Sequence, residues 1–347
     1  MLNKYNDYKA DLQKKASSQK HNANKSTDEK VLFNSELELF TSYGYDSFVA
    51  WKNQPNIKGK YINTDELGRR VTPQDNNASK TATVHFFGGS TMWGHSVTDS
   101  GTIPSQFALI NKKYKVINWG EQAYNSRQEL NLLLNNLNTI KKGDIVIFFD
   151  GVNDIYNNCR QSNSANGHIR HYEFSNIIKS KKTIEEESIC TLNKVLKQST
   201  IYTAVQKILI EKNIIKEQKI MTKKPSDGFI AKTICSTNKN RAIQVRDFLT
   251  NNWKAAESIL RDKGVTFIPI LQPNPYTAKE YTKLKQGNYM LPTKAVYPLV
   301  GEEAKKIDNY YDMSHIFKDQ KYYYDCCHVN RTANKILAEK INSLIND

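Results

Sequence analysis

The run Ile145–Phe149, five consecutive apolar residues, restricts the fold more than any other stretch of the chain. A strand that is apolar at every position has no side suited to solvent, so it is expected to be buried on both faces, as in parallel sheets covered by helices. Three further strands are predicted at Thr83–Phe87, Lys115–Asn118 and Val265–Leu271. Because helical patterns separate these strands, the sequence predicts an α/β fold with a mainly parallel sheet.

Helices are predicted before, between and after the later strands, at Pro104–Asn111, Ser126–Ile140, Arg241–Lys263 and Thr332–Ile345. The segment 276–306 is instead predicted to be an irregular loop that holds three helical turns. Lys321–Asp325 then leads through a turn into the last helix. This order places the ends of several strands and one late turn at positions where functional side chains can meet.

The remaining segments divide the chain into an N-terminal part and a main domain. Residues 1–30 are rich in Lys, Asn, Ser and Gln, which is typical of a solvated arm, and residues 31–80 carry aromatic residues that need a surface to pack against. We expect residues 1–80 to form an arm and an extension packed on the main domain, residues 81–347. Residues 156–240 are polar and too long for an ordinary connection, so they are predicted to form a helical insertion or lid.

The length and charge of the chain limit the classes of partner. At 347 residues it forms one large domain or two ordinary ones, and a hydrophobic fraction of 39% permits a sizeable core. Lys and Arg number 50 against 35 Asp and Glu, a net charge of +15. This excess favours an anionic glycan or a membrane surface as partner, with a generally basic, soluble surface as the alternative. No nucleic-acid-binding signature accompanies the scattered basic residues, so nucleic acid is not an expected partner.

The cysteines and the N-terminal residues bear on the compartment. Cys159, Cys190, Cys235, Cys326 and Cys327 form an odd, irregular set, which argues against a disulfide scaffold and favours a reducing compartment. The first 30 residues lack the apolar core of a signal peptide, and no apolar run approaches the ~20 residues that span a bilayer. The expectation is a soluble, cytoplasmic protein. The alternative is an envelope-associated form whose anchor precedes this sequence.

The first predicted strand ends in Gly88, Gly89, Ser90 and Thr91. Glycines allow the backbone to turn sharply and allow a ligand to approach without meeting a Cβ atom. Ser90 would then lie at the carboxyl end of a strand, where open α/β sheets hold their ligands. The alternative is that Ser90 or Thr91 only caps the helix that follows.

Three other stretches place polar groups at the same edge of the predicted sheet. Gly120 follows the second strand, Asn153 follows the third, and Asp325 lies three residues before His328 in the turn that precedes the last helix. His328 can remove the proton of Ser90 as a general base, and Asp325 can hold the imidazole in the required tautomer. The backbone N–H groups of Ser90 and Gly120 and the side-chain amide of Asn153 are candidate donors to an oxyanion.

These blocks resemble the SGNH (GDSL-like) hydrolase superfamily, with Gly88-Gly89-Ser90-Thr91, Gly120, Gly151-Val152-Asn153-Asp154 and Asp325-Cys326-Cys327-His328 in the family's order. The similarity spans residues 61–341 without the insertion and is greatest to a bacterial branch with a GGST first block, often linked to surface-polysaccharide modification. It implies a flavodoxin-like three-layer α/β/α sandwich and a serine esterase or acyltransferase without a metal or other cofactor. By this resemblance Ser90, His328 and Asp325 form the catalytic triad, and Ser90, Gly120 and Asn153 form the oxyanion hole. The first block has Gly-Gly-Ser where the family at large has Gly-Asp-Ser, and Asn330–Asn334 replaces the usual small-residue turn after His328.

Other side chains have two interpretations. Trp93, His95, Trp119 and Tyr124 are candidates to line a substrate pocket, with core packing as the alternative for the aromatic residues. His85 is interpreted as a core or sheet-face residue. A metal site at Cys326, Cys327, His328 and His315 is disfavoured, since adjacent cysteines rarely both face one ion.

The first functional hypothesis is a serine esterase that removes acyl groups, O-acetyl in particular, from a carbohydrate through an acyl-enzyme. The second is an O-acyltransferase, in which a hydroxyl group of a polysaccharide replaces water on the same acyl-enzyme. The third is a non-catalytic glycan-binding or assembly protein that keeps the fold.

Overall fold

The computed structural model describes residues 32–38, 43–75, 80, 82–160, 164–171, 173–175, 233–277 and 287–346. The chain divides into two compact units, one formed by residues 1–169 with 232–347 and the other by residues 170–231. In the second unit the described residues are 170, 171 and 173–175, where Arg170 forms an ion pair with Glu173. The predicted N-terminal arm, 1–30, and most of the predicted insertion or lid, 156–240, lie outside the described residues.

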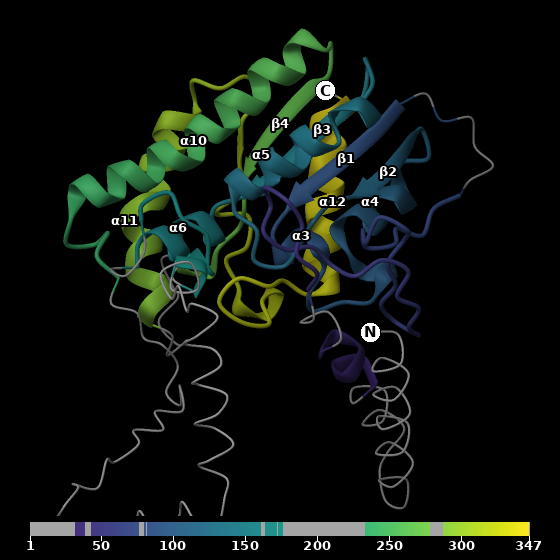
Figure 1. Cartoon of the computed structure of the whole chain (residues 1–347), viewed down its shortest axis with the longest axis horizontal. Helices are drawn as coiled ribbons and strands as arrows, with labels where there is room; N and C mark the ends of the chain where they lie inside the picture. Colours follow the sequence, from purple (N-terminus) through teal and green to yellow (C-terminus); the bar gives the residue numbers. More distant parts are fainter. Residues whose placement is uncertain are drawn as a thin grey trace, which may run out of the picture. The chain divides into compact units, whose positions relative to one another are not determined.

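The described part of the first unit contains a five-stranded sheet in which every neighbouring pair is parallel (Figure 1). Its order is β2-β1-β3-β4-β5, the flavodoxin-like order of doubly wound folds. The strands are β1 (Ala82–Gly88), β2 (Tyr114–Asn118), β3 (Ile145–Asp150), β4 (Thr266–Leu271) and β5 (Tyr311–Asp312). The predicted parallel α/β sheet is therefore confirmed.

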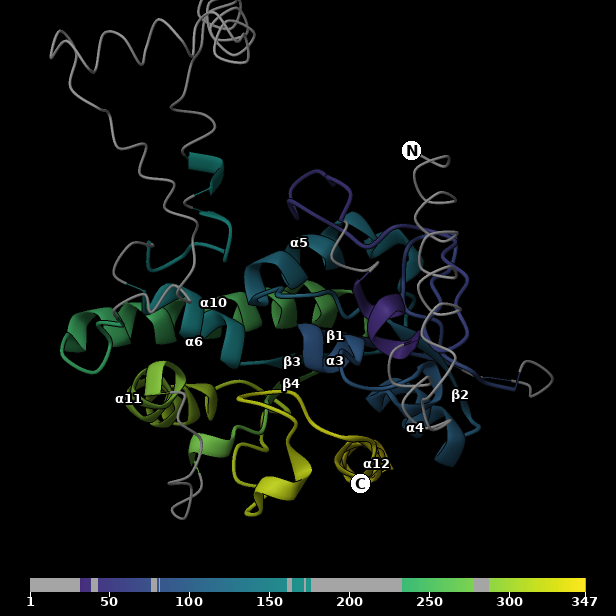
Figure 2. The same ribbon diagram turned by 90° about the horizontal axis from the view of Figure 1, so that it is seen from below.

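Alternate residues of the strands face two separate hydrophobic clusters. Phe87, Val146 and Phe148 belong to a cluster that includes residues of α5 (Ser126–Asn135) and α10 (Lys239–Asp262). The intervening strand residues belong to a second cluster with α4 (Ile103–Ile110) and α12 (Arg331–Asn346). Helices therefore lie on both sides of the sheet, as Figure 2 shows, and the first unit is a three-layer α/β/α sandwich. The full burial of β3 follows from this arrangement.

The helices begin where the sequence supplies capping groups. The Thr102 side chain accepts from Ser105 N at the start of α4, and Asn125 accepts from Gln128 N at the start of α5. Asn238 does the same for α10 by accepting from Arg241 N. Two short helices follow strands at the edge where the candidate site lies, namely α3 (Ser90–Trp93) after β1 and α6 (Val152–Asn158) after β3. The first and last predicted helices agree with α4 and α12 within one or two residues.

The segment predicted as an irregular loop, 276–306, contains instead the helix α11 (Gly287–Ala304). Two prolines inside this helix, Pro292 and Pro298, made the loop prediction wrong, because proline ordinarily interrupts helices. Burial compensates for their cost, since an apolar stripe with helical spacing, Val296, Val300 and Ala304, is fully buried and α11 packs against α10. The two-residue strand β5 was also not predicted, because it is too short to show an alternating pattern.

The described part of the N-terminal extension contacts the sheet domain through buried side chains. The Trp51 indole N–H donates to the carbonyl oxygen of Gln122 at 2.9 Å, and the Tyr124 hydroxyl donates to the carbonyl oxygen of Trp51. Asn53 N donates to Glu121 Oε2. These bonds join the extension to the loop after β2, which carries Gly120.

Cys159 and Cys235 form a disulfide, which corrects the expectation that the cysteines are thiols of a reducing compartment. The irregular spacing hid this pair, because 76 residues separate its members in the sequence. Both sulfur atoms are buried in the hydrophobic cluster that contains α10. Since disulfides persist mainly in oxidising environments, the cysteine argument for a cytoplasmic location no longer holds.

Within the part of the chain that the structure describes, none of the helices combines the length and the apolar character that crossing a membrane requires.

Candidate active site

Ser90 is the first residue of α3, directly after the turn that ends β1. Two glycines permit this turn because other groups come very close to them. A Cβ atom on Gly89 would lie 2.3 Å from Asn153 Nδ2, and one on Gly88 would lie 2.5 Å from the Met92 Cβ. The Gly-Gly sequence therefore allows the Ser90 turn and the Asn153 side chain to occupy adjacent space.

His328 lies in a turn that Asp325 organises. The backbone N–H groups of Cys327 and His328 donate to Asp325 Oδ1 at 2.9 and 2.8 Å. Such side-chain to backbone bonds are typical of Asx turns. Thr91 links this turn to the turn of Ser90, since its hydroxyl donates to the carbonyl oxygen of Cys327 at 3.4 Å. The short sequence separation of Asp325 and His328 thus produces a hydrogen-bonded carboxylate–imidazole pair.

The side chains of Ser90, His328 and Asp325 form a continuous hydrogen-bonded line. Ser90 Oγ lies 2.8 Å from His328 Nε2, and His328 Nδ1 lies 2.6 Å from Asp325 Oδ2. Asp325 and His328 lie at least 235 positions after Ser90 in the sequence. The fold, and not the local sequence, therefore brings the three side chains together. The line can move a proton from a serine hydroxyl to an imidazole, which is the first step of nucleophilic acyl transfer.

The electrostatics of the line favour an ionised carboxylate at Asp325. Partial burial by itself would raise the pKa of Asp325. The hydrogen bond and charge of His328, together with the backbone N–H groups of His328 and Cys327, outweigh that cost and hold the pKa well below its usual range. Asp325 is therefore an acceptor for the Nδ1–H group of His328 throughout the range of pH in which proteins are stable.

His95 lies against His328. Its ring stacks on the ring of His328 with centroids 4.5 Å apart and an interplanar angle of 25°. The Gln122 amide Nε2 lies 3.0 Å from His95 Nδ1, so Gln122 donates and the proton of a neutral His95 is on Nε2. Burial and the neighbouring His328 lower the pKa of His95 to about 4. His95 is thus a neutral neighbour of the base near pH 7.

This lowered pKa predicts a pH-dependent contribution of His95 to stability. Between the ordinary histidine value of about 6.5 and a pH of about 4, the unfolded chain binds a proton that folded His95 rejects, so stability falls as the pH is lowered through this window. The unfolding free energy of the wild type should fall between pH 7 and 4.5, and in His95→Gln this fall should be smaller by about 1–2 kcal/mol. The difference is less than the full pKa shift implies, because solvent screens part of it. Urea unfolding at both pH values measures this. His315→Gln, at an exposed histidine, is the control, and an unchanged loss in His95→Gln would contradict the assignment.

The predicted oxyanion donors lie around Ser90, and two of them already have acceptors. The Gly120 N–H donates to Asn118 Oδ1 at 2.9 Å, and Asn153 Nδ2 donates to the carbonyl oxygen of Tyr124 at 2.7 Å. The second N–H of the Asn153 amide remains for another acceptor. Gly120 lies close to the nucleophile turn, since a Cβ atom on it would be 2.4 Å from Trp93 N. A ligand oxygen would have to share or replace the Asn118 acceptor to use the Gly120 N–H.

Three buried carboxyl groups underlie the Asn153 turn. Ser126 donates to Asp154 through its N–H and its hydroxyl, and the Trp253 indole donates to Asp150 at 2.7 Å. Burial raises the pKa of Asp154 and of Glu129 well above the usual range, and that of Asp150 to about 6. Protonation of these groups avoids the cost of three buried negative charges. The bonds from Ser126 to Asp154 therefore tie α6, which carries Asn153, to α5.

Arg70 of the N-terminal extension anchors the segment that follows Ser90. Its side chain is buried, pairs with Asp99 at 2.5 Å and lies over the Trp93 ring. It also donates to the carbonyl oxygens of Gly94 and Val97. Arg70 was not predicted from the sequence, because nothing in the spacing of a single arginine 20 residues before Ser90 marks it as a partner.

We expect Arg70→Met to lower the unfolding free energy by about 3–5 kcal/mol, because it leaves Asp99 buried without its cation. Urea unfolding measures the loss. The matched control is Lys305→Met at an ion pair with Glu302 whose side chains are 66% and 76% exposed. It should change stability by less than about 0.5 kcal/mol. A loss below about 1 kcal/mol for Arg70→Met would contradict this role.

The three aromatic residues that were predicted to line a substrate pocket belong to the core instead. Trp93, Trp119 and Tyr124 are each at most 1% exposed and pack in the core, so none presents a ring face on which a sugar could stack. The core-packing alternative accounts for their positions. His85 is also a core residue, bonded to Asp144 and to the Trp119 indole N–H. Of the four predicted lining residues, only His95 remains at the candidate site.

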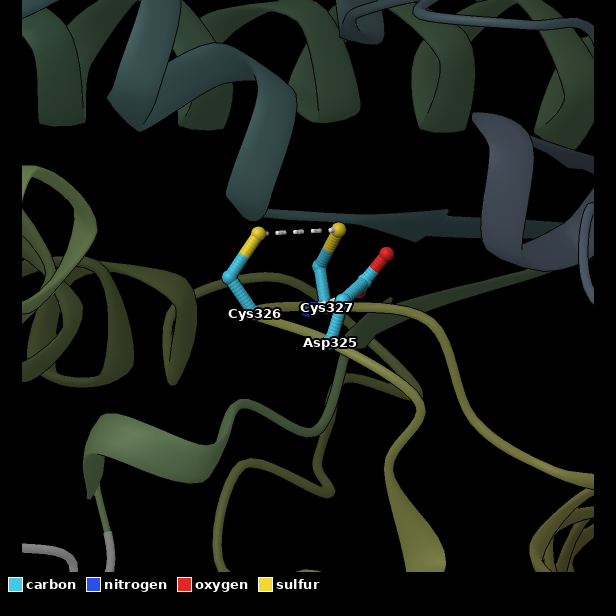
Figure 3. Close-up of side chains that lie close together, drawn as sticks. All are labelled: Asp325, Cys326 and Cys327. Carbon is cyan, nitrogen blue, oxygen red and sulfur yellow. Dashed lines mark hydrogen bonds between the residues drawn. The ribbon is translucent and has the colours of Figure 1, made fainter. Parts of the chain in front are cut away.

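One group of potential metal ligands lies in the base-bearing turn. Single ligand atoms of Asp325, Cys326 and Cys327 are within 4.8 Å of one another (Figure 3). His315, which the sequence analysis considered with the cysteines, is not part of this group. Asp325 is shared between this group and the hydrogen-bonded line to Ser90.

Comparison with known proteins finds similar structures but no sequence match. No family model matches the chain, and no curated protein matches it. A member of the lipolytic protein G-D-S-L family from Veillonella parvula is 11% identical, with 77% of this chain and 99% of that chain covered at a TM-score of 0.42. The acetyl xylan esterase AlAXEase is 13% identical, with 76% and 99% covered at 0.42. A carbohydrate acetylesterase from Sinorhizobium meliloti is 12% identical, with 77% and 99% covered at 0.41.

Proposed function

We propose that this protein is a serine esterase that cleaves acyl esters through a covalent acyl-enzyme on Ser90. The observation that carries the proposal is the line of hydrogen bonds from Ser90 Oγ to His328 Nε2 at 2.8 Å and from His328 Nδ1 to Asp325 Oδ2 at 2.6 Å. A serine hydroxyl becomes an effective nucleophile when a positioned base removes its proton. The placement of Ser90 after β1, in a doubly wound sheet, agrees with the usual location of such sites.

In the proposed first half-reaction, Ser90 Oγ attacks the ester carbonyl while its proton moves to His328 Nε2. The carboxylate of Asp325 holds Nδ1–H and stabilises the imidazolium that forms. The free N–H of the Asn153 amide and the backbone N–H groups of Ser90 and Gly120 are the proposed donors to the oxyanion. Each such donor contributes on the order of 3 kcal/mol to transition-state stabilisation. His328 then returns the proton to the leaving alcohol.

In the second half-reaction, water or another hydroxyl attacks the acyl-enzyme with His328 again as base. This shared step is why hydrolysis and transfer to a polysaccharide use the same residues. We propose an O-acetylated carbohydrate as the substrate, on the strength of the sequence blocks around Ser90 and His328.

The test is turnover of short aryl esters by the purified full chain, with and without an acceptor glycan. Acyl release with water as the acceptor supports the esterase, and acyl-glycan formation in place of it supports the acyltransferase. Labelling by a fluorophosphonate, followed by peptide mass analysis, should locate the adduct on Ser90. The absence of both turnover and labelling would favour the non-catalytic glycan-binding hypothesis.

A further inference from the structure

The thiols of Cys326 and Cys327 point to the same side of the turn that carries His328, as Figure 3 shows. Neighbouring side chains of an extended strand point to opposite faces, but here the Asp325 turn changes that geometry. The two sulfur atoms lie 3.8 Å apart, and both side chains are buried beside Val152 and Tyr276. This turn therefore has the arrangement, rare for adjacent cysteines, in which both sulfur atoms could face one ion.

The sulfur separation matches the geometry of a tetrahedral thiolate site. Two zinc–sulfur bonds of about 2.3 Å at a tetrahedral angle place the sulfur atoms about 3.8 Å apart. A carboxylate oxygen of Asp325 completes a set of three ligand atoms within 4.8 Å of one another. Thiolate ligands select Zn²⁺ and similar soft ions over Mg²⁺ and Ca²⁺.

We propose that Cys326, Cys327 and Asp325 form a binding site for a thiophilic divalent cation, and that the bound ion inhibits the enzyme by withdrawing Asp325 from His328. The binding half stands on the geometry of the turn alone, whereas the inhibition half rests on the proposed esterase function.

Binding replaces two thiol protons by one cation. The two thiols become thiolates, two protons pass to solvent, and the ion with two thiolates and one carboxylate carries a net charge of −1. Coordination brings about this deprotonation, because a metal-bound thiol is deprotonated outright. A water molecule can take the fourth tetrahedral position.

Inhibition follows from the hydrogen bonds that Asp325 already makes. Asp325 Oδ1 accepts two backbone N–H groups and Oδ2 accepts His328 Nδ1. Coordination through Oδ2 removes the partner of the imidazole while the turn itself is retained.

The experiment titrates the full chain, freed of metal, with Cd²⁺ and Zn²⁺. Cadmium–thiolate charge-transfer absorption should rise until one ion per chain is bound, with an intensity that corresponds to two thiolates. Aryl-ester turnover should fall in proportion to the bound ion, and a chelator should restore it. X-ray absorption of the zinc-loaded protein should show two sulfur neighbours at about 2.3 Å. Cys326→Ala should keep basal turnover and weaken binding more than about 100-fold, since loss of even an outer-shell partner weakens binding about 10–100-fold. Cys190→Ala is the matched cysteine control and should bind as the wild type does.

Each contrary result would overturn a different part of the proposal. Fewer than two sulfur neighbours, or unchanged binding in both Cys326→Ala and Cys327→Ala, would overturn the site. Stoichiometric binding without loss of turnover would overturn the inhibition. A wild-type chain without turnover would refute the proposed function, and the cadmium and X-ray measurements would still decide the site. Thermal melts identify a variant that fails to fold, in which case the wild-type X-ray measurement decides.

Discussion

Ser90→Ala is expected to reduce ester turnover by at least about 10⁴-fold while leaving the thermal melting temperature nearly unchanged. The hydroxyl is the group that would form the acyl-enzyme, and in a related triad the loss of the nucleophile costs about 10⁶-fold. The stability should hardly change, because the substitution removes one hydroxyl whose described partner is His328. The measurements are turnover of one aryl ester and a thermal melt of each protein.

His328→Ala should cause a similar loss, and the double variant should be little worse than either single variant, because triad members act as a unit. Thr91→Val is the matched control, since it removes a neighbouring hydroxyl that bonds only weakly to the Cys327 carbonyl oxygen at 3.4 Å. Activity that persists in Ser90→Ala would refute the nucleophile assignment. Losses that multiply in the double variant would show that Ser90 and His328 act independently.

The strands β1 to β4 and the four blocks could be predicted from the sequence because their signals are local. In the strand Ile145–Asp150 every residue before Asp150 is apolar, and Gly88 and Gly89 identify the turn before Ser90. Asp325 and His328 are three residues apart, so their contact could be inferred from one turn. The prediction of α11 failed for the opposite reason, because tertiary burial of Val296 and Val300 outweighs two helix-breaking prolines.

Long-range contacts of the extension were not predictable from single residues. Arg70 reaches Asp99, Gly94 and Val97 only because the chain folds back across the nucleophile turn. The stacking of His95 on His328 joins positions 233 residues apart. A single sequence records the types of these residues but not which of them become neighbours, so their roles depend on the packed structure.

Asp325→Asn separates the two roles that the structure gives to Asp325. The asparagine Oδ1 can still accept the N–H groups of Cys327 and His328, so the turn should be retained. Its Nδ2, however, is a donor where His328 Nδ1 requires an acceptor. The imidazole would then adopt the tautomer with its proton on Nε2, which cannot accept the proton of Ser90. We expect kcat to fall about 10⁴-fold, as in a related triad.

The charge of Asp325 also predicts a pH dependence of stability. The pKa of Asp325 is lowered in the folded protein, so the stability that its charge contributes is fully present above the unfolded value of about 3.9 and is lost as the pH falls through the lower folded value. Asp325→Asn should therefore lose less stability than the wild type as the pH is lowered from about 5 to 2. Asp325→Ala, which removes the turn bonds as well, should lose turnover and also unfold more easily at neutral pH. If Asp325→Asn kept kcat within a few-fold of the wild type, the carboxylate would have no part in the reaction and a Ser90–His328 dyad would suffice.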